Sequence, residues 1–575
     1  NIESIKVIKG GASYLYGNDA LAGAIVITTK KPKGESASKI EGEIGSFNSK
    51  RLLATTNQSF GNSALQLQAS YRDTDGYWDD AYATIKSVNG KYVYYIDETS
   101  DVTFGLDYTN RKTGDGNSVS GTIEAEEDPR SVGEYSYSGY YDSDLIKGFV
   151  SYSKDFGEES NLMVQLHTYQ DDKTYKTARR KYDANEVWKQ NGAKGEYRTA
   201  FGPLAVMAGL DIQRNTTDEL RYLAADGSLN NDYETEEAIN AVYTELILQV
   251  TERLTTTFNF RYDYIEQKYI NDLDSTNNVS PTYKVPSYRA GFNYTLPENN
   301  SLYANFSTGF RTPTPGQISN NAVNLMNDPT LDIPLEIDPE TTYNYELGAR
   351  GQIRTNGRIE TLFYNASIYQ LDRYDYIGQI AGNYITSDDE NESNYDNVGD
   401  MRSRGFELAM YSDQSRMFSF NLAYTYLDAV FTSYTISQQI TADPDGPYRP
   451  LTATYERKDL SGNRVPRTSK HMIDFTLHFK PVEAALISAE IYARSSYYAD
   501  EANNYEMPGY AVMNLRGEYR FNEMFEIFGR IDNLLNKNYY QFANINSSAL
   551  ADDTTDMTIR VAPPRAYYAG LRIRF

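Results

Sequence analysis

Aromatic side chains gather in two segments of this sequence, where stacked rings could recognise a ligand. The first segment holds Tyr77, Trp78 and Tyr82, and the second holds Tyr135, Tyr137, Tyr140 and Tyr141. Rings around a pocket grip an apolar or catechol ligand, and a nearby arginine meets its negative charge. The same rings could equally form an interfacial girdle or pack a loop. The candidate ligand-binding residues are therefore Tyr77, Trp78, Tyr82, Tyr137, Tyr140 and Tyr141.

The three histidines are the side chains that could ligate haem iron, and they are His167, His471 and His478. His478 falls on the polar face of an alternating segment, and His471 lies at the start of the same segment. The stretch from 311 to 470 contains no histidine. We interpret His471 and His478 as ordinary lumen or rim residues rather than as haem ligands.

Acidic residues cluster at 124–128, at 388–392 and at 272–277. The third cluster resembles a calcium loop, but it lacks the glycine at position six and the glutamate at position twelve. We interpret all three as solvated loop surface, with calcium bridging between loops, or to lipopolysaccharide, as the alternative. We therefore predict no metal site and no cofactor.

No pattern in the sequence indicates an enzyme. The chain has no G-x-S-x-G, no H-E-x-x-H and no glycine loop that would cradle a phosphate. The absence of cysteine excludes disulfides and thiolate metal sites. A net charge of -24 argues against a nucleic-acid partner, which requires basic patches.

Short segments of alternating polarity must position these residues. Residues 567–575 place one set of side chains on an apolar face, namely Tyr567, Ala569, Leu571, Ile573 and Phe575. Residues 65–72, 258–264, 473–480 and 513–521 alternate in the same way. Strands of about ten residues with one apolar and one polar face are typical of membrane β-barrels, where lipid contacts one face and a wet lumen the other.

The connections between these strands alternate in length. Short turns are predicted at 61–62, 157–159, 202–203, 297–300, 355–357, 480–481 and 522–523. Long loops are predicted at 113–142, 171–188, 218–235, 311–339, 372–402, 431–467 and 534–564. The pattern predicts an all-β fold, a transmembrane antiparallel β-barrel of about 22 strands with both ends at the periplasmic side. A soluble β-propeller is the alternative, but no blade repeat occurs.

The first residues do not follow the barrel pattern. Gly10 and Gly11 end a short strand, 13–21 is compact, and 23–28 reads as a buried strand. This segment resembles the end of the plug domain of TonB-dependent outer-membrane receptors, with its V-x-V-x-[KR]-G-x-x-S-x-x-Y-G and G-G-x-I-x-I patterns. Ala22 stands where the first glycine of the pair is usual. The resemblance divides the chain into the C-terminal end of a plug domain, 1–33, and a transmembrane barrel, 34–575.

Further motifs of that family occur in its order along the chain. Residues 310–313 are similar to F-R-x-P, and 339–348 to P-E followed by E-L-G. Residues 397–407 are similar to N-V followed by G-x-E, and 532–540 to N-L-[FL]-[DN]-K-x-Y. Arg311 of the first motif joins the candidate ligand-binding residues.

The resemblance implies a receptor in the outer membrane of a Gram-negative bacterium. Such a receptor binds a ferric siderophore, or another scarce ligand such as cobalamin or haem, and imports it by TonB-dependent active transport. TonB acts through a TonB box, which this sequence does not contain. We expect a monomer surrounded by outer-membrane lipid and lipopolysaccharide. The alternative is a passive open pore, because the plug is largely absent from this sequence.

Overall fold

The fold is an almost purely β structure. The computed structural model describes residues 2–32, 36–114, 116–131, 139–176, 182–224, 226–273, 275, 278–319, 321, 334, 336–355, 357, 359–385, 391–413, 417–439, 455–545 and 553–575. No helix among these residues combines the length and the apolar character needed to cross a membrane.

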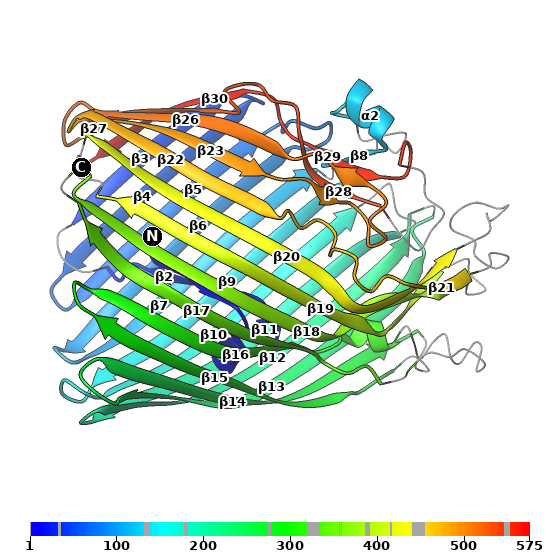
Figure 1. Cartoon of the computed structure of the whole chain (residues 1–575), viewed down its shortest axis with the longest axis horizontal. Helices are drawn as coiled ribbons and strands as arrows, with labels where there is room; N and C mark the ends of the chain where they lie inside the picture. Colours follow the sequence, from blue (N-terminus) through cyan, green and yellow to red (C-terminus); the bar gives the residue numbers. More distant parts are fainter. Residues whose placement is uncertain are drawn as a thin grey trace.

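Within the described chain, 22 antiparallel strands form a closed barrel, as the sequence predicted (Figure 1). In chain order they are β3 Ala37–Gly45, β4 Ser49–Phe60, β5 Ser63–Thr74, β6 Ala83–Asp97, β7 Ser100–Gly114, β9 Tyr140–Asp155, β10 Asn161–Lys176, β11 Tyr182–Phe201, β12 Leu204–Leu223, β13 Leu229–Gln249, β14 Leu254–Asn271, β15 Thr282–Leu296, β16 Asn300–Arg311, β17 Glu340–Arg354, β18 Thr361–Ile385, β19 Asn391–Ser412, β20 Phe418–Gln439, β22 His471–Val482, β23 Ala485–Arg494, β26 Tyr510–Arg520, β27 Phe525–Asp532 and β30 Ala566–Arg574. Each strand pairs with the next, and β3 closes the circle against β30 with Lys39 opposite Arg574.

The alternation of side chains gives the wall an apolar outer face and a polar lumen. Leu302, Leu347 and Ile368 lie on the outer face and remain about half exposed to the surroundings. At the seam, the inward-facing Arg572 lies between Glu41 and Glu526, both almost fully buried. This ion cluster holds the first, last and penultimate strands of the barrel in register.

The two ends of the barrel differ, as the alternating connection lengths predicted (Figure 1). One end, which we call the turn end, carries the short connections such as 61–62, 202–203 and 521–524, together with the C-terminus. The opposite loop end carries the long connections, including 115–139, 312–339 and 533–565.

Several strands extend further than the sequence pattern indicated. β10 to β13 run into the segments predicted as loops at 171–188 and 218–235, and β18 and β19 fill most of 372–402. About ten residues suffice to cross a membrane, so the further residues of these strands continue the β-pairing outside it. The predicted turn at 480–481 is also displaced, since β22 reaches Val482 after a break in register. Pro481 has no N–H for the ladder, which explains the break.

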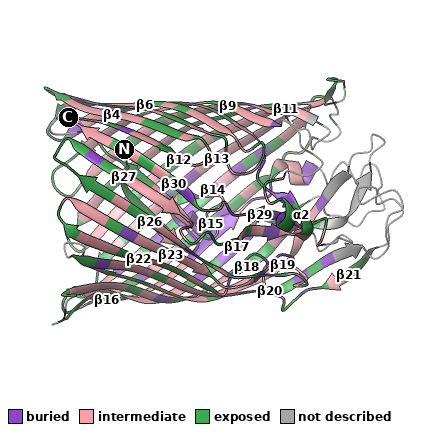
Figure 2. Ribbon diagram, turned by 90° about the horizontal axis from the view of Figure 1, so that it is seen from above, coloured by how far each residue is buried: buried purple, intermediate pink, exposed green. Residues whose placement is uncertain are grey.

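Small elements cover the loop end. They are β8 Val119–Ser120, α2 Thr122–Glu127, β24 Tyr497–Tyr498, β25 Glu506–Met507, β28 Tyr540–Asn544 and β29 Thr558–Val561, while β21 Tyr455–Asp459 extends the hairpin of β20. Ala499, Met557 and Ile559 lie in the apolar cluster that joins these elements. Figure 2 shows buried residues concentrated around β29 and α2. This cluster makes the loop end a packed rim.

The N-terminal segment lies inside the barrel (Figure 1). It comprises β1 Ile2–Lys9, α1 Ser13–Tyr16 and β2 Gly23–Thr29, with β1 and β2 paired antiparallel. Lys9 forms an ion pair with Glu407 of β19, and Lys31 forms another with Asp101 of β7 at 2.6 Å. The segment therefore reaches wall strands that are far apart in the barrel.

Candidate ligand site in the barrel mouth

A cavity of about 780 Å³ opens at the loop end of the lumen. The connections 46–48, 75–82 and 533–565 contribute to its lining, together with inward residues of β5, β22, β23 and β26. Its aromatic lining residues are Phe47, Tyr77, Trp78, Phe475, Tyr492, Tyr539 and Tyr568. Two of the predicted ligand-binding residues, Tyr77 and Trp78, are thus brought to one cavity.

One side of this mouth cavity is an edge-to-face group of three rings. The Tyr77 ring lies 5.8 Å from that of Phe47 and 5.6 Å from that of Trp78, both at 68°. Gly76, at φ +77, makes this close turn possible, because a Cβ there would lie 2.4 Å from the Ala81 oxygen. Burial raises the pKa of the Tyr77 hydroxyl. The Trp78 Nε1 is buried with no acceptor among the described residues, so this N–H is an unsatisfied donor within the wall of the mouth cavity.

Another side of the cavity is a ladder of tyrosines that the sequence did not identify. The ring centroids of Tyr492 and Tyr510 are 6.0 Å apart, and those of Tyr510 and Tyr539 are 4.4 Å apart. The Arg494 guanidinium lies 4.9 Å from the Tyr492 ring. Burial raises the pKa of the Tyr539 hydroxyl, which keeps it a neutral donor. Tyr539 belongs to the N-L-[FL]-[DN]-K-x-Y motif. It is therefore the only one of these three tyrosines that a sequence motif indicated.

The charges in the mouth are of both signs. Glu490 is paired with Arg516 at 2.7 Å, and Asp532 with Arg530 at 3.3 Å. Arg72 and Asp474 also line the cavity, and neither forms an ion pair within the described part of the chain. The walls therefore offer aromatic surface, one cation without an ion-pair partner, and a carboxylate that Arg494 attracts.

The second predicted aromatic group is divided by the barrel wall. Tyr140 shares the outward face of β9 with Ile146 and Val150, and its ring lies 4.5 Å from the Lys112 ammonium. Tyr141 faces the lumen, where its ring lies 4.7 Å from the Arg111 guanidinium. Tyr137 and Tyr135 lie outside the described residues. Tyr82 is half-buried beside Gly114 and is not part of the mouth cavity.

Arg311 already has a protein partner. Its guanidinium donates to both oxygens of Glu340 at 3.0 and 2.8 Å, from the opposite position on β17. Glu340 is fully buried and also accepts from Arg373 and from the Ile377 N–H. The F-R-x-P and P-E motifs thus meet in one ion cluster at the base of the 312–339 connection.

The end of β16 also holds the N-terminal segment. The pairing of β16 with β15 ends at Ser307, opposite Arg289. The backbone groups of β16 beyond Ser307 are therefore open on that side to other partners. The Phe310 N–H donates to the Ser13 hydroxyl at 3.0 Å, and its carbonyl accepts from the Asp19 N–H at 3.0 Å. The S-x-x-Y-G motif and the F-R-x-P motif therefore dock on each other.

Near this contact, the buried side chain of Arg261 joins α1 to the barrel wall. Arg261 lies between Asp211 and Asp263, at 3.2 and 2.8 Å, and donates to the Leu15 carbonyl at 3.4 Å. Gly17 adopts φ +76 directly above it, and a Cβ there would lie 2.8 Å from Arg261 Nη2. Gly17 of the motif is thus required by both its conformation and its neighbour.

The remaining motif asparagines fix the bases of loops. Asn397 donates to the Asp338 and Asp375 carbonyls at 3.0 and 2.7 Å. Asn533, at φ +51, donates to the Lys537 and Pro563 carbonyls at 2.9 and 3.3 Å. The latter contacts join both ends of the connection that lines the mouth.

The histidines and acidic clusters do not form a metal-binding group within the described residues. Both ring nitrogens of His478 have partners, Ser488 and Asn421. His471 contacts the Tyr424 hydroxyl at 3.0 Å on the outward face. His167 lies on β10 against Gly192. Of the acidic residues, 124–128 belongs to α2 and its C-cap, while 388–390, 274 and 277 lie outside the described residues.

These features match a known family. The family described as TonB dependent receptor-like, beta-barrel matches residues 41–534. The chain belongs to this family. Its relatives are transport receptors rather than enzymes, and the family is found in the outer membrane of Gram-negative bacteria, which the closed barrel fits.

Individual relatives are distant but cover nearly the whole chain. The probable TonB-dependent siderophore receptor PiuA of Acinetobacter baumannii is 21% identical over 94% of this chain and 78% of its own length. The metal-pseudopaline receptor CntO of Pseudomonas aeruginosa is 21% identical over 94% and 77%. Among solved structures, the unliganded ferric citrate transporter FecA has a TM-score of 0.80 at 18% identity, covering 100% of this chain and 84% of that one. At this identity the structure supports the fold alone.

Proposed function

We propose that this receptor binds a ferric siderophore, or a similar metal chelate, in the mouth cavity and imports it by TonB-dependent transport. The observation that carries the proposal is the cavity itself, whose volume of about 780 Å³ falls in the range of small-molecule sites. A chelate arrives with its metal already wrapped, so it requires stacking and hydrogen-bonding walls rather than metal ligands. Tyr77, Trp78 and Tyr539 supply such walls.

The proposal includes an orientation and a domain division. The loop end faces the outside of the cell and the turn end the periplasm, because short periplasmic turns and long outer loops are the rule for such barrels. Residues 1–33 are the end of a plug domain, and 34–575 are the barrel. Supporting the ligand class, relatives are named as siderophore and metal-pseudopaline receptors.

Uptake measurements test the proposal. A strain that lacks the gene is grown on a panel of ferric chelates as sole iron source, with and without the full receptor, and labelled iron uptake is followed with and without TonB. We expect growth on at least one chelate and uptake that stops without TonB. Uptake that continues without TonB would show a passive pore. Growth on haem that is lost in His478→Ala would show the wrong ligand class.

A further inference from the structure

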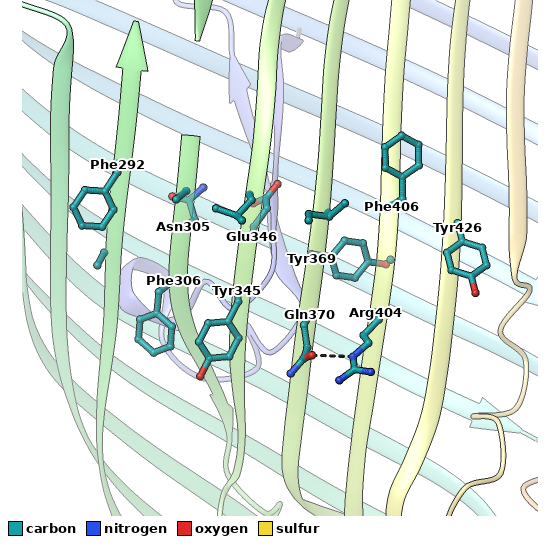
Figure 3. A pocket seen from close by; sticks show the side chains of 15 residues that line it. Phe292, Asn305, Phe306, Tyr345, Glu346, Tyr369, Gln370, Arg404, Phe406 and Tyr426 are labelled. Atoms are coloured by element: carbon teal, nitrogen blue, oxygen red, sulfur yellow. Dashed lines mark hydrogen bonds between the residues drawn. The ribbon is translucent and has the colours of Figure 1, made fainter. Parts of the chain in front are cut away.

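The outer wall over β15 to β20 carries a groove of about 740 Å³ (Figure 3). Its position on the lipid-facing side follows from the alternation of the strands, since Phe292, Leu347 and Ile368 in its lining are outward-facing and about half exposed. It is therefore separate from the mouth cavity, which opens into the lumen.

The groove exists because small and large residues alternate along its floor. Ala290 lies opposite Phe306, and Ala304 lies opposite Phe292. The Phe306 ring instead lies beside that of Tyr345, with centroids 5.3 Å apart. The small side chains of Ala290 and Ala304 leave a trough between the rings of Phe292 and Phe306. The walls of this trough are apolar.

The polarity of the wall changes at one end of this groove. Across β17, β18 and β19, one row of outward residues consists of Leu347, Ile368 and Phe406. The next row toward the loop end contains Tyr345, Gln370 and Arg404, and the row beyond contains the ion pair of Asp372 and Arg402 at 2.6 Å. Arg404 thus lies where the apolar wall gives way to charge, which is the level of lipid headgroups.

Arg404 is a surplus cation at this boundary. It is exposed and donates to the Gln370 Oε1 at 2.9 Å, but it forms no ion pair with any described residue (Figure 3). Its cross-strand neighbour Asp428 lies 3.6 Å from the Lys470 ammonium. The two nearby carboxylates, Asp372 and Asp428, therefore each have another base as partner.

We propose that this groove is a binding site for an anionic, phosphate-bearing membrane lipid. The phosphate accepts hydrogen bonds from the Arg404 guanidinium and from the second amide proton of Gln370, whose first is donated to Asp372 at 2.8 Å. An acyl chain runs from there along the trough toward the turn end. This direction matches that of a lipid of the leaflet on the loop side, whose headgroup lies at the boundary and whose chains point to the membrane centre. A free phosphate would use Arg404 but would leave the trough without an occupant.

Native mass spectrometry of the purified full receptor tests the site. The delipidated protein is titrated with dioleoylphosphatidylglycerol, or with dioleoylphosphatidylcholine, which has the same chains and no net charge. Arg404→Gln removes the cation, and Ala304→Phe fills the trough. Arg214→Gln is the matched control, because Arg214 also faces outward beside Asn240 but is not part of the groove.

We expect one phosphatidylglycerol retained at least about fivefold more tightly than phosphatidylcholine. Each groove variant should lose that preference or the bound lipid, while Arg214→Gln keeps both. Equal retention of the two lipids by the parent protein would overturn the proposal. Retention unchanged in both Arg404→Gln and Ala304→Phe would also overturn it. Retention of inorganic phosphate alone, unaffected by Ala304→Phe, would replace the lipid site with an anion site.

Discussion

Replacing Glu340 with glutamine should loosen the wall beneath the 312–339 connection. The change leaves Arg311 and Arg373 facing each other without a carboxylate, while the amide oxygen can still accept from the Ile377 N–H. Breaking a buried ion pair costs about 3–5 kcal/mol. The two arginine side chains are 28% and 25% exposed, so water screens part of the loss. We expect a cost of about 2–4 kcal/mol.

Hydrogen exchange measures this cost locally. If opening of the pair β16 and β17 becomes easier by about 2–4 kcal/mol, amides in 305–311 and 340–346 should exchange about 30-fold to 700-fold faster. The matched control is Glu236→Gln, because Glu236 forms an exposed pair with Lys268 at 2.8 Å. Exposed ion pairs contribute less than about 1 kcal/mol. In the control variant, amides around Glu236 on β13 and Lys268 on β14 should therefore exchange only about fivefold faster or less. Equal acceleration in the two variants would refute the assigned role of Glu340.

Two further changes test the N-terminal segment and the orientation. Gly17→Ala should cost about 1–3 kcal/mol through strain at φ +76 and contact with Arg261, and exchange should rise within 12–20 but not in the barrel. The same change at Gly61, where a Cβ would meet nothing within 4 Å, controls for the strain, and an undisturbed segment in Gly17→Ala would contradict the docking. A cysteine at Thr435 should label in whole cells and one at Asn299 should not, and the reverse pattern would invert the proposed orientation.

The architecture could be predicted because it depends on a local pattern. Alternation in segments such as 258–264 and 567–575 gave the strands, and the unequal connections gave the two ends. The extent of β18 and β19 could not be read in this way, because beyond Tyr374 and before Gly399 the two strands pair only with each other. Apolar residues such as Ile377 lie opposite polar ones such as Asn397 there, without a clear alternation. Propensity within either segment alone does not indicate such pairing.

The candidate site was predictable only in part, because it depends on register across distant strands. Tyr77 and Trp78 are sequence neighbours, so their joint position followed from the sequence. Tyr140 and Tyr141 are also neighbours, but alternation places them on opposite faces of the wall. The partnership of Arg311 with Glu340 requires the pairing of β16 with β17 across a long connection. No local pattern indicates that pairing.

The central claim is that the mouth cavity binds the chelate, and a binding isotherm tests it most directly. The ferric chelate that supports growth is titrated by calorimetry into the wild-type receptor, into Tyr77→Ala/Trp78→Ala, and into Tyr140→Ala as the outward-facing control. Each stacked ring contributes about 0.5–1.5 kcal/mol beyond its area, so two rings correspond to about 5-fold to 150-fold in affinity. We predict that loss in the double variant, with Tyr140→Ala within about twofold of wild type. Undiminished affinity in the double variant, with the barrel intact, would contradict the assignment of the mouth cavity as the binding site.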